Sequence, residues 1–185
     1  MLSLLQQRIM RSLYGNARKL LGVGALAALV IALNPSGIFN SAQATTALPE
    51  CNNYSENLIE GDDNNNNLHG TDGRDLMLGK GGHDHMFGGD CRDEMRGGNG
   101  SDHMAGQDGN DEMYGGNGND EMWGGKGNDQ MFGGSGSDKI SGGQGSDKLT
   151  GGPGADHFNC GPGTDTIVDY TPSQGDTKTA NCENF

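Results

Sequence analysis

Apolar residues recur at every ninth position over a long central part of the chain, from Gly61 to Val168. In a nine-residue unit that starts at Gly61, position eight is apolar in twelve successive units without insertion or deletion: Leu68, Met77, Met86, Met95, Met104, Met113, Met122, Met131, Ile140, Leu149, Phe158 and Ile167. Position eight with its two neighbours therefore predicts a short strand, whose central side chain faces one way and whose neighbours face the other. Because one apolar side chain per unit cannot form a core alone, the period predicts a stack of repeated units.

The first half of each unit predicts a turn. Glycine predominates at positions one, two and four, and it tolerates the positive φ angles that a tight bend requires. Two units then form one coil of 18 residues, and twelve units form six coils that stack at about 4.8 Å around a narrow apolar core. The preceding segment Asn52–Glu60 has Asn57 and Ile59 at the corresponding positions, which indicates a degenerate additional unit.

Position six is the second constant feature of the unit. It is Asn66 in the first unit and aspartate in the other eleven: Asp75, Asp84, Asp93, Asp102, Asp111, Asp120, Asp129, Asp138, Asp147, Asp156 and Asp165. Alternate units fall in the same column, so carboxylates one coil apart would repel by about 3 kcal/mol per pair at an effective dielectric constant of 20. A divalent cation between successive turns would reverse the sign of this interaction. Calcium suits such a position because it accepts six to eight oxygen ligands, including backbone carbonyls, in flexible geometry.

Units such as GGNGNDEMW (115–123) and GGKGNDQMF (124–132) resemble the RTX, or hemolysin-type, calcium-binding nonapeptide repeat, GGxGxDxUx. The resemblance implies an all-β fold, a parallel β-roll that is a right-handed β-helix with calcium ions between its stacked turns. It implies that the eleven position-six aspartates are the metal ligands. Two columns of six turns leave space for up to about ten calcium ions.

The N-terminal 44 residues differ from the remainder in composition. A basic stretch ends at Lys19, an apolar run extends from Leu20 to Leu33, and small residues precede a possible cleavage point after Ala44. Fourteen apolar residues are short for a membrane span of about 20, so we expect a cleaved signal peptide, a secreted protein and no membrane span after cleavage. Removing this segment changes the net charge from −13 to −17. Such acidity argues against nucleic acid as a partner and favours cations.

Four cysteines remain outside the predicted signal peptide, and an even number in an exported protein predicts two disulfides. Three pairings are possible, and we favour Cys51–Cys91 and Cys160–Cys182 because each would tie a cap to one end of the roll. The predicted organisation is a signal peptide over 1–44, an N-terminal cap with a degenerate repeat over 45–60, twelve repeats over 61–168 and a C-terminal cap over 169–185.

Three further sets of side chains admit a structural and a functional interpretation. The seven methionines after Ala44 all occupy position eight, where packing in the core explains them better than binding of copper(I). His85 and His103 share position seven in adjacent coils, and an exposed pair without function is a simpler interpretation than a metal bridge. Four aromatic residues at position nine should face outward, either as isolated surface side chains or as a surface for glycan, cell surface or a second copy: Phe87, Tyr114, Trp123 and Phe132.

The motifs of common hydrolases are missing from the sequence. It contains neither HExxH nor GxSxG, and the repeats and caps leave no segment for a catalytic domain, so we expect no enzyme. The predicted function is a secreted calcium-binding repeat protein that folds as calcium fills its turns. The alternative is an extracellular adhesin or matrix component that uses the aromatic residues of position nine. Typical RTX toxins and proteases carry an uncleaved C-terminal export signal, whereas an N-terminal signal is expected here, which argues against toxin function.

Overall fold

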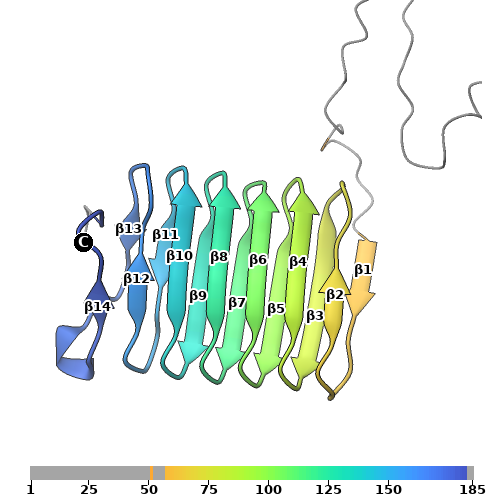
Figure 1. Cartoon of the computed structure of the whole chain (residues 1–185), viewed down its shortest axis with the longest axis horizontal. Helices are drawn as coiled ribbons and strands as arrows, with labels where there is room; N and C mark the ends of the chain where they lie inside the picture. The colour runs from red at the N-terminus through yellow and green to blue at the C-terminus, as the bar shows by residue number, and fades with distance from the viewer. Residues whose placement is uncertain (1–50, 52–56, 183–185) are drawn as a thin grey trace, which may run out of the picture. The chain divides into compact units, whose positions relative to one another are not determined.

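The computed structural model of the chain describes Cys51 and residues 57–182. The predicted signal peptide and most of the predicted N-terminal cap lie outside the described residues. The described part is all-β apart from one short 3-10 turn, η1 (Pro172–Gln174), which confirms the predicted fold class (Figure 1). No helix in it is long and apolar enough to cross a membrane.

Strands alternate along the chain between two parallel sheets, as Figure 1 shows from the side of the stack. The odd-numbered strands form the first sheet: β1 (Asn57–Glu60), β3 (Asp75–Gly81), β5 (Glu94–Asn99), β7 (Glu112–Asn117), β9 (Gln130–Ser135), β11 (Lys148–Thr150) and β13 (Thr166–Ile167). The even-numbered strands form the second: β2 (Asn67–His69), β4 (His85–Asp90), β6 (His103–Asp108), β8 (Glu121–Lys126), β10 (Lys139–Gln144), β12 (His157–Asn159) and β14 (Thr177–Lys178).

The register between neighbouring strands confirms the coil of two nine-residue units. Met113 pairs with Met131 eighteen residues later, and Met104 pairs with Met122 in the other sheet. Ile59 pairs with Met77 in the same register, so the chain before Gly61 adds a strand to the stack. At the other end His157 pairs with Thr177, twenty residues later, so the segment after the repeats contributes a final strand. The roll therefore has about seven coils, one more than the twelve repeats supply.

The strands are longer than the sequence predicts, and the turns are shorter. A central strand such as β7 begins at position seven and continues through both glycines to position three of the next unit. The glycines were expected in the turn because of their freedom at positive φ, and Gly116 does have a φ of 115°. It nevertheless stays in the ladder, because its neighbours Gly98 and Gly134 have the same conformation at the same height in adjacent coils. Only positions four to six form the turn.

Position eight forms the core, as predicted. All seven methionines from Met77 to Met131 have no exposed surface, and Ile140, Leu149, Phe158 and Ile167 continue the same two rows. Methionine suits this narrow space because its unbranched thioether adapts to irregular gaps. Position nine lies on the outer face, where Trp123 is 42% exposed.

Two disulfides fasten the ends of the roll, and both have the predicted pairing. Cys51–Cys91 joins the N-terminal segment to the turn between β4 and β5. Cys160–Cys182 joins the residue after β12 to the chain beyond β14. A disulfide that closes a loop of 22 residues stabilises a fold by about 3 kcal/mol in the chain-entropy description.

Gln107 occupies position two, where most units have glycine, and its φ of 78° lies in the left-handed region. This conformation costs a residue with a Cβ atom about 1 to 2 kcal/mol. We expect Gln107→Gly to stabilise the roll by about 1 kcal/mol, because the greater freedom of glycine in the unfolded chain offsets part of the relief. A thermal melt in saturating calcium should then shift upward by about 4 °C. Gln107→Ala retains the Cβ atom and serves as the control, and an equal shift in that variant would contradict this explanation.

Candidate metal centre

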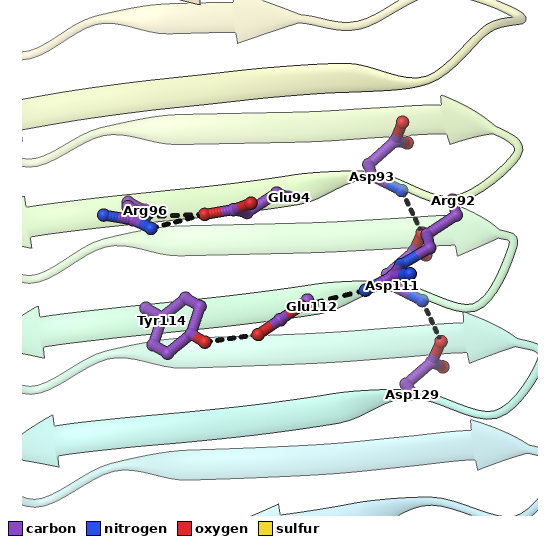
Figure 2. A network of polar contacts seen from close by, with 8 residues as sticks. All are labelled: Arg92, Asp93, Glu94, Arg96, Asp111, Glu112, Tyr114 and Asp129. Atoms are coloured by element: carbon purple, nitrogen blue, oxygen red, sulfur yellow. Dashed lines mark hydrogen bonds and ion pairs between the residues drawn. The ribbon is translucent and has the colours of Figure 1, made fainter. Parts of the chain in front are cut away.

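The position-six aspartates form two columns, one at each edge of the sheets. Within a column the backbone N–H of each aspartate donates to Oδ1 of the aspartate one coil later. Asp102 donates to Asp120 and Asp120 to Asp138, each at 2.8 Å. Figure 2 shows the other column at Asp93, Asp111 and Asp129. The structure thus places the aspartates predicted from the sequence in the two predicted columns.

These carboxyl groups are buried, which changes their acidity. The eleven position-six aspartates expose at most 2% of their surface. Burial, reinforced by the neighbouring carboxylates of the column, raises the pKa of Asp93, Asp120 and Asp129 to about 7. Burial raises the pKa of Asp111 and Asp138 to about 6. The N–H donated to each Oδ1 opposes this shift without cancelling it, so the columns are costly to ionise in the absence of a cation.

The second carboxylate oxygen, Oδ2, lacks a hydrogen-bond partner in most of the column aspartates. Oδ2 is buried and has no hydrogen-bond partner in nine of the aspartates: Asp84, Asp93, Asp102, Asp111, Asp120, Asp129, Asp138, Asp147 and Asp156. A buried acceptor without a partner costs about 1 to 3 kcal/mol, and more when it is charged. An oxygen-seeking cation would remove this cost along the whole length of the roll.

Glycine at position one allows the backbone to approach each of these oxygens closely. A Cβ atom on Gly124 would lie 2.3 Å from Asp129 Oδ2 and 2.4 Å from the carbonyl oxygen of Gly142 in the next coil. Gly115 has the same relation to Asp120 Oδ2, at 2.4 Å, and to the Gly133 carbonyl, at 2.5 Å. A carboxylate oxygen and a backbone carbonyl of the next coil therefore lie close together beside this glycine, and any larger residue would clash with both. The donors are all oxygen, which is the set that calcium prefers.

Carboxylates alone do not enclose an ion in this arrangement. Among the described residues, no group of three or more His, Cys, Asp and Glu side chains could hold a metal ion. The columns bring aspartates together in successive pairs, so any ion between turns must take most of its ligands from backbone carbonyls. Calcium accepts carbonyl oxygens readily, whereas magnesium requires a stricter octahedron and retains its water.

Two features of the columns were missed from the sequence. Asp176 extends one column by another step, because its Oδ1 accepts the backbone N–H of Asp156 at 3.0 Å. Its Oδ2 accepts the N–H of Thr171 at 2.6 Å, and Asp75 at the opposite end is satisfied in the same way by Thr71, also at 2.6 Å. The two-residue insertion before Asp176 breaks the nine-residue period, although Gly175-Asp176 retains the glycine and aspartate of a turn.

A second ladder runs through position five in the opposite direction. The side-chain oxygen of Asn119 accepts the backbone N–H of Ser137 at 2.8 Å, and Asn110 accepts that of Asn128 at 2.7 Å in the other column. These bonds explain why the variable position five is so often asparagine or serine. They hold successive turns at a constant spacing without using either oxygen of the aspartates.

The comparison with family models agrees with this geometry. The RTX calcium-binding nonapeptide repeat model matches residues 60–95, 96–131 and 132–167, which together are more than half of the chain. The chain belongs to the RTX calcium-binding nonapeptide repeat family. No curated protein matches it.

The outer face of the RTX roll carries its own contacts at position nine. Tyr114 stacks on Phe132 with ring centroids 4.9 Å apart, and the guanidinium of Arg96 lies 5.5 Å from the centre of the tyrosine ring. The Tyr114 hydroxyl donates to Glu112, which also pairs with Arg92 (Figure 2). This hydrogen bond is the main reason why the pKa of Glu112 is lowered. The tyrosine ring therefore already contacts neighbours from adjacent coils, which accounts for this part of position nine by packing along the stack.

Proposed function

We propose that this RTX chain is a secreted calcium-binding protein whose roll folds when calcium enters the turns. The observation that carries the proposal is the series of buried Oδ2 atoms without hydrogen-bond partners, repeated from Asp84 to Asp156. From Asp84 to Asp147, each of these atoms lies beside a position-one glycine and close to a carbonyl oxygen of the following coil. A calcium ion that coordinates both oxygens would supply the missing partner.

The sparse core explains why binding and folding would be coupled. Each nine-residue unit contributes one large apolar side chain, while glycine supplies 35 of the 185 residues and raises the entropy lost on folding. Ionised carboxylates buried in two columns oppose folding further. Because calcium binds only the assembled turns, its binding free energy becomes folding free energy, as in other small metal-dependent domains.

The proposed ligands are the eleven position-six aspartates from Asp75 to Asp165, together with turn carbonyls. We place each ion between successive turns of one column, which gives up to about ten ions. Asp75 Oδ2 already accepts two bonds from Thr71, so we expect the strongest sites in the interior of the columns.

Export would deliver the chain to a calcium-rich environment. Both disulfides fit an oxidising compartment, and extracellular modules function with calcium sites as weak as about 10⁻⁴ to 10⁻³ M. We propose cleavage after Ala44, caps over 45–60 and 169–185 and a role that is structural and binding rather than enzymatic. RTX rolls are generally structural elements, which supports this last point.

Calorimetric titration of the calcium-free protein tests the proposal. We expect several ions to bind cooperatively, with a large favourable enthalpy that includes folding, and strand content measured by circular dichroism to rise in parallel. Titration with magnesium is the control and should produce neither signal. Saturation by one or two ions, or calcium binding with no gain of strand, would exclude the proposed columns of sites.

A further inference from the structure

His85 and His103 lie side by side on the outer face of the second sheet. They pair in register between β4 and β6, and their rings stack with centroids 4.9 Å apart and planes 7° from parallel. Both side chains are exposed. They border a groove of about 470 Å³ that is also lined by His83, Ser101 and the segment 65–67, so three imidazoles face one recess of the surface.

The surroundings of His103 distinguish its two ring nitrogens. Nδ1 of His103 lies 3.6 Å from the carboxylate of Glu121 in the next coil. A carboxylate at Nδ1 holds the proton on that nitrogen and leaves the lone pair on Nε2, which is the usual arrangement around a histidine that ligates a metal. His83 is fixed at the wall of the groove by its Nδ1 atom, which is 2.8 Å from the backbone nitrogen of Ser101.

We propose that His85 and His103 bind one divalent transition-metal ion of the zinc, nickel and copper class through their Nε2 atoms. Imidazole suits these ions, whereas calcium prefers oxygen, so the site is chemically distinct from the aspartate columns. Because the described residues contain no cluster of three or more ligating side chains, water completes the coordination. To hold one ion, the rings rotate out of their parallel stack until both Nε2 atoms converge, and their exposure permits this rotation. Glu121 is a positioning residue that orients His103.

Such an ion would join two adjacent coils on the outside of the roll, independently of the calcium inside the turns. The proposal requires the folded roll and rests on the proposed function only because calcium is needed for folding. Calcium-dependent folding and the histidine site can therefore be tested separately. Loss of folding appears in circular dichroism, whereas loss of the histidine site appears only in transition-metal binding.

Trp123 provides a local reporter for the test. It is the single tryptophan of the chain, and its ring lies 6.3 Å from that of His103. Titration of the calcium-loaded protein with nickel should quench tryptophan fluorescence in a saturable manner with one equivalent, and zinc should reverse the quenching by competition. His85→Gln and His103→Gln should each weaken nickel binding at least tenfold without changing the circular dichroism spectrum.

Three further variants, at two positions, make the test specific. His157→Gln changes an exposed histidine at the same position of the second sheet, four coils from His85, and should leave binding unchanged. Glu121→Ala should weaken binding more than Glu121→Gln, which retains an acceptor for His103. Quenching that survives both His85→Gln and His103→Gln would overturn the proposal. Quenching that excess calcium abolishes would also overturn it, because the ion would then occupy the aspartate columns.

Discussion

Chelation of calcium at pH 8 should remove most of the strand signal of this protein. Asp93, Asp120 and Asp129, whose pKa burial raises to about 7, are largely ionised at that pH. Without calcium, nine aspartates of the two columns bury an oxygen that has no partner. The single apolar side chain of each unit cannot offset this cost together with the entropy of ordering a glycine-rich chain. Circular dichroism before and after addition of excess chelator provides the measurement, and return of calcium should restore the spectrum.

The same protein in chelator should regain strand content as the pH falls from 8 to 5. Burial raises the folded-state pKa of Asp93, Asp120 and Asp129 to about 7 and that of Asp111 and Asp138 to about 6, so the folded state binds protons more tightly than the unfolded chain does. The calcium-free roll is therefore most stable below the unfolded pKa, and it loses this stability as the pH rises through about 6 to 7. Protons would partly substitute for calcium. A calcium-free chain with full strand content at pH 8 and no gain on acidification would contradict this explanation.

Asp120→Asn should change the stability of the protein in opposite directions with and without calcium. Asparagine retains an oxygen that can accept the N–H of Asp102, as Oδ1 of Asp120 does, but it removes the buried charge between Asp102 and Asp138. In chelator at pH 7 to 8 we expect stabilisation of about 1 to 3 kcal/mol, because no ionised carboxylate is then buried without a partner at this point. In saturating calcium we expect destabilisation, because two adjacent sites lose a charged ligand. A tenfold weaker site corresponds to 1.4 kcal/mol.

Urea denaturation measures the effect in saturating calcium, and the pH at which strand content returns on acidification measures the effect in chelator. Asp108→Asn is the matched control, since Asp108 is an exposed aspartate at position three that pairs with Lys126 at 2.8 Å. The control should change stability by less than about 0.5 kcal/mol in either condition. Destabilisation by Asp120→Asn in both conditions would show that the carboxylate is needed for the roll itself rather than for calcium.

Much of this architecture was predictable because the repeat is regular. Position eight became the core, and the aspartates of alternate units fell into two columns, because both follow directly from the 18-residue coil. The disulfide pairing was also predictable, since caps must be attached at the two ends of a stack. The core positions and the two columns could be assigned from the nine-residue period alone, without knowledge of contacts between coils.

The features that escaped prediction depend on contacts between coils. Glycine at position two was assigned to a turn from its own conformational freedom, whereas Gly98 and Gly116 remain in a strand because each repeats the conformation of the other. Asp176 was hidden by an insertion of two residues, although its contact with Asp156 matches those of the regular column. The polar ladder at position five was missed because each bond joins a side chain to a backbone eighteen residues away.

The hydrogen bonds of the aspartate columns all point the same way, from a backbone N–H to the carboxylate of the following coil. A coil that joins the stack on its N-terminal side finds an acceptor already in place, whereas one that joins on the C-terminal side must itself provide the acceptor for its predecessor. Asp176 ends this series, since its own carboxylate is satisfied locally by Thr171. The turn of each coil therefore depends for one of its acceptors on the coil that follows it in the sequence.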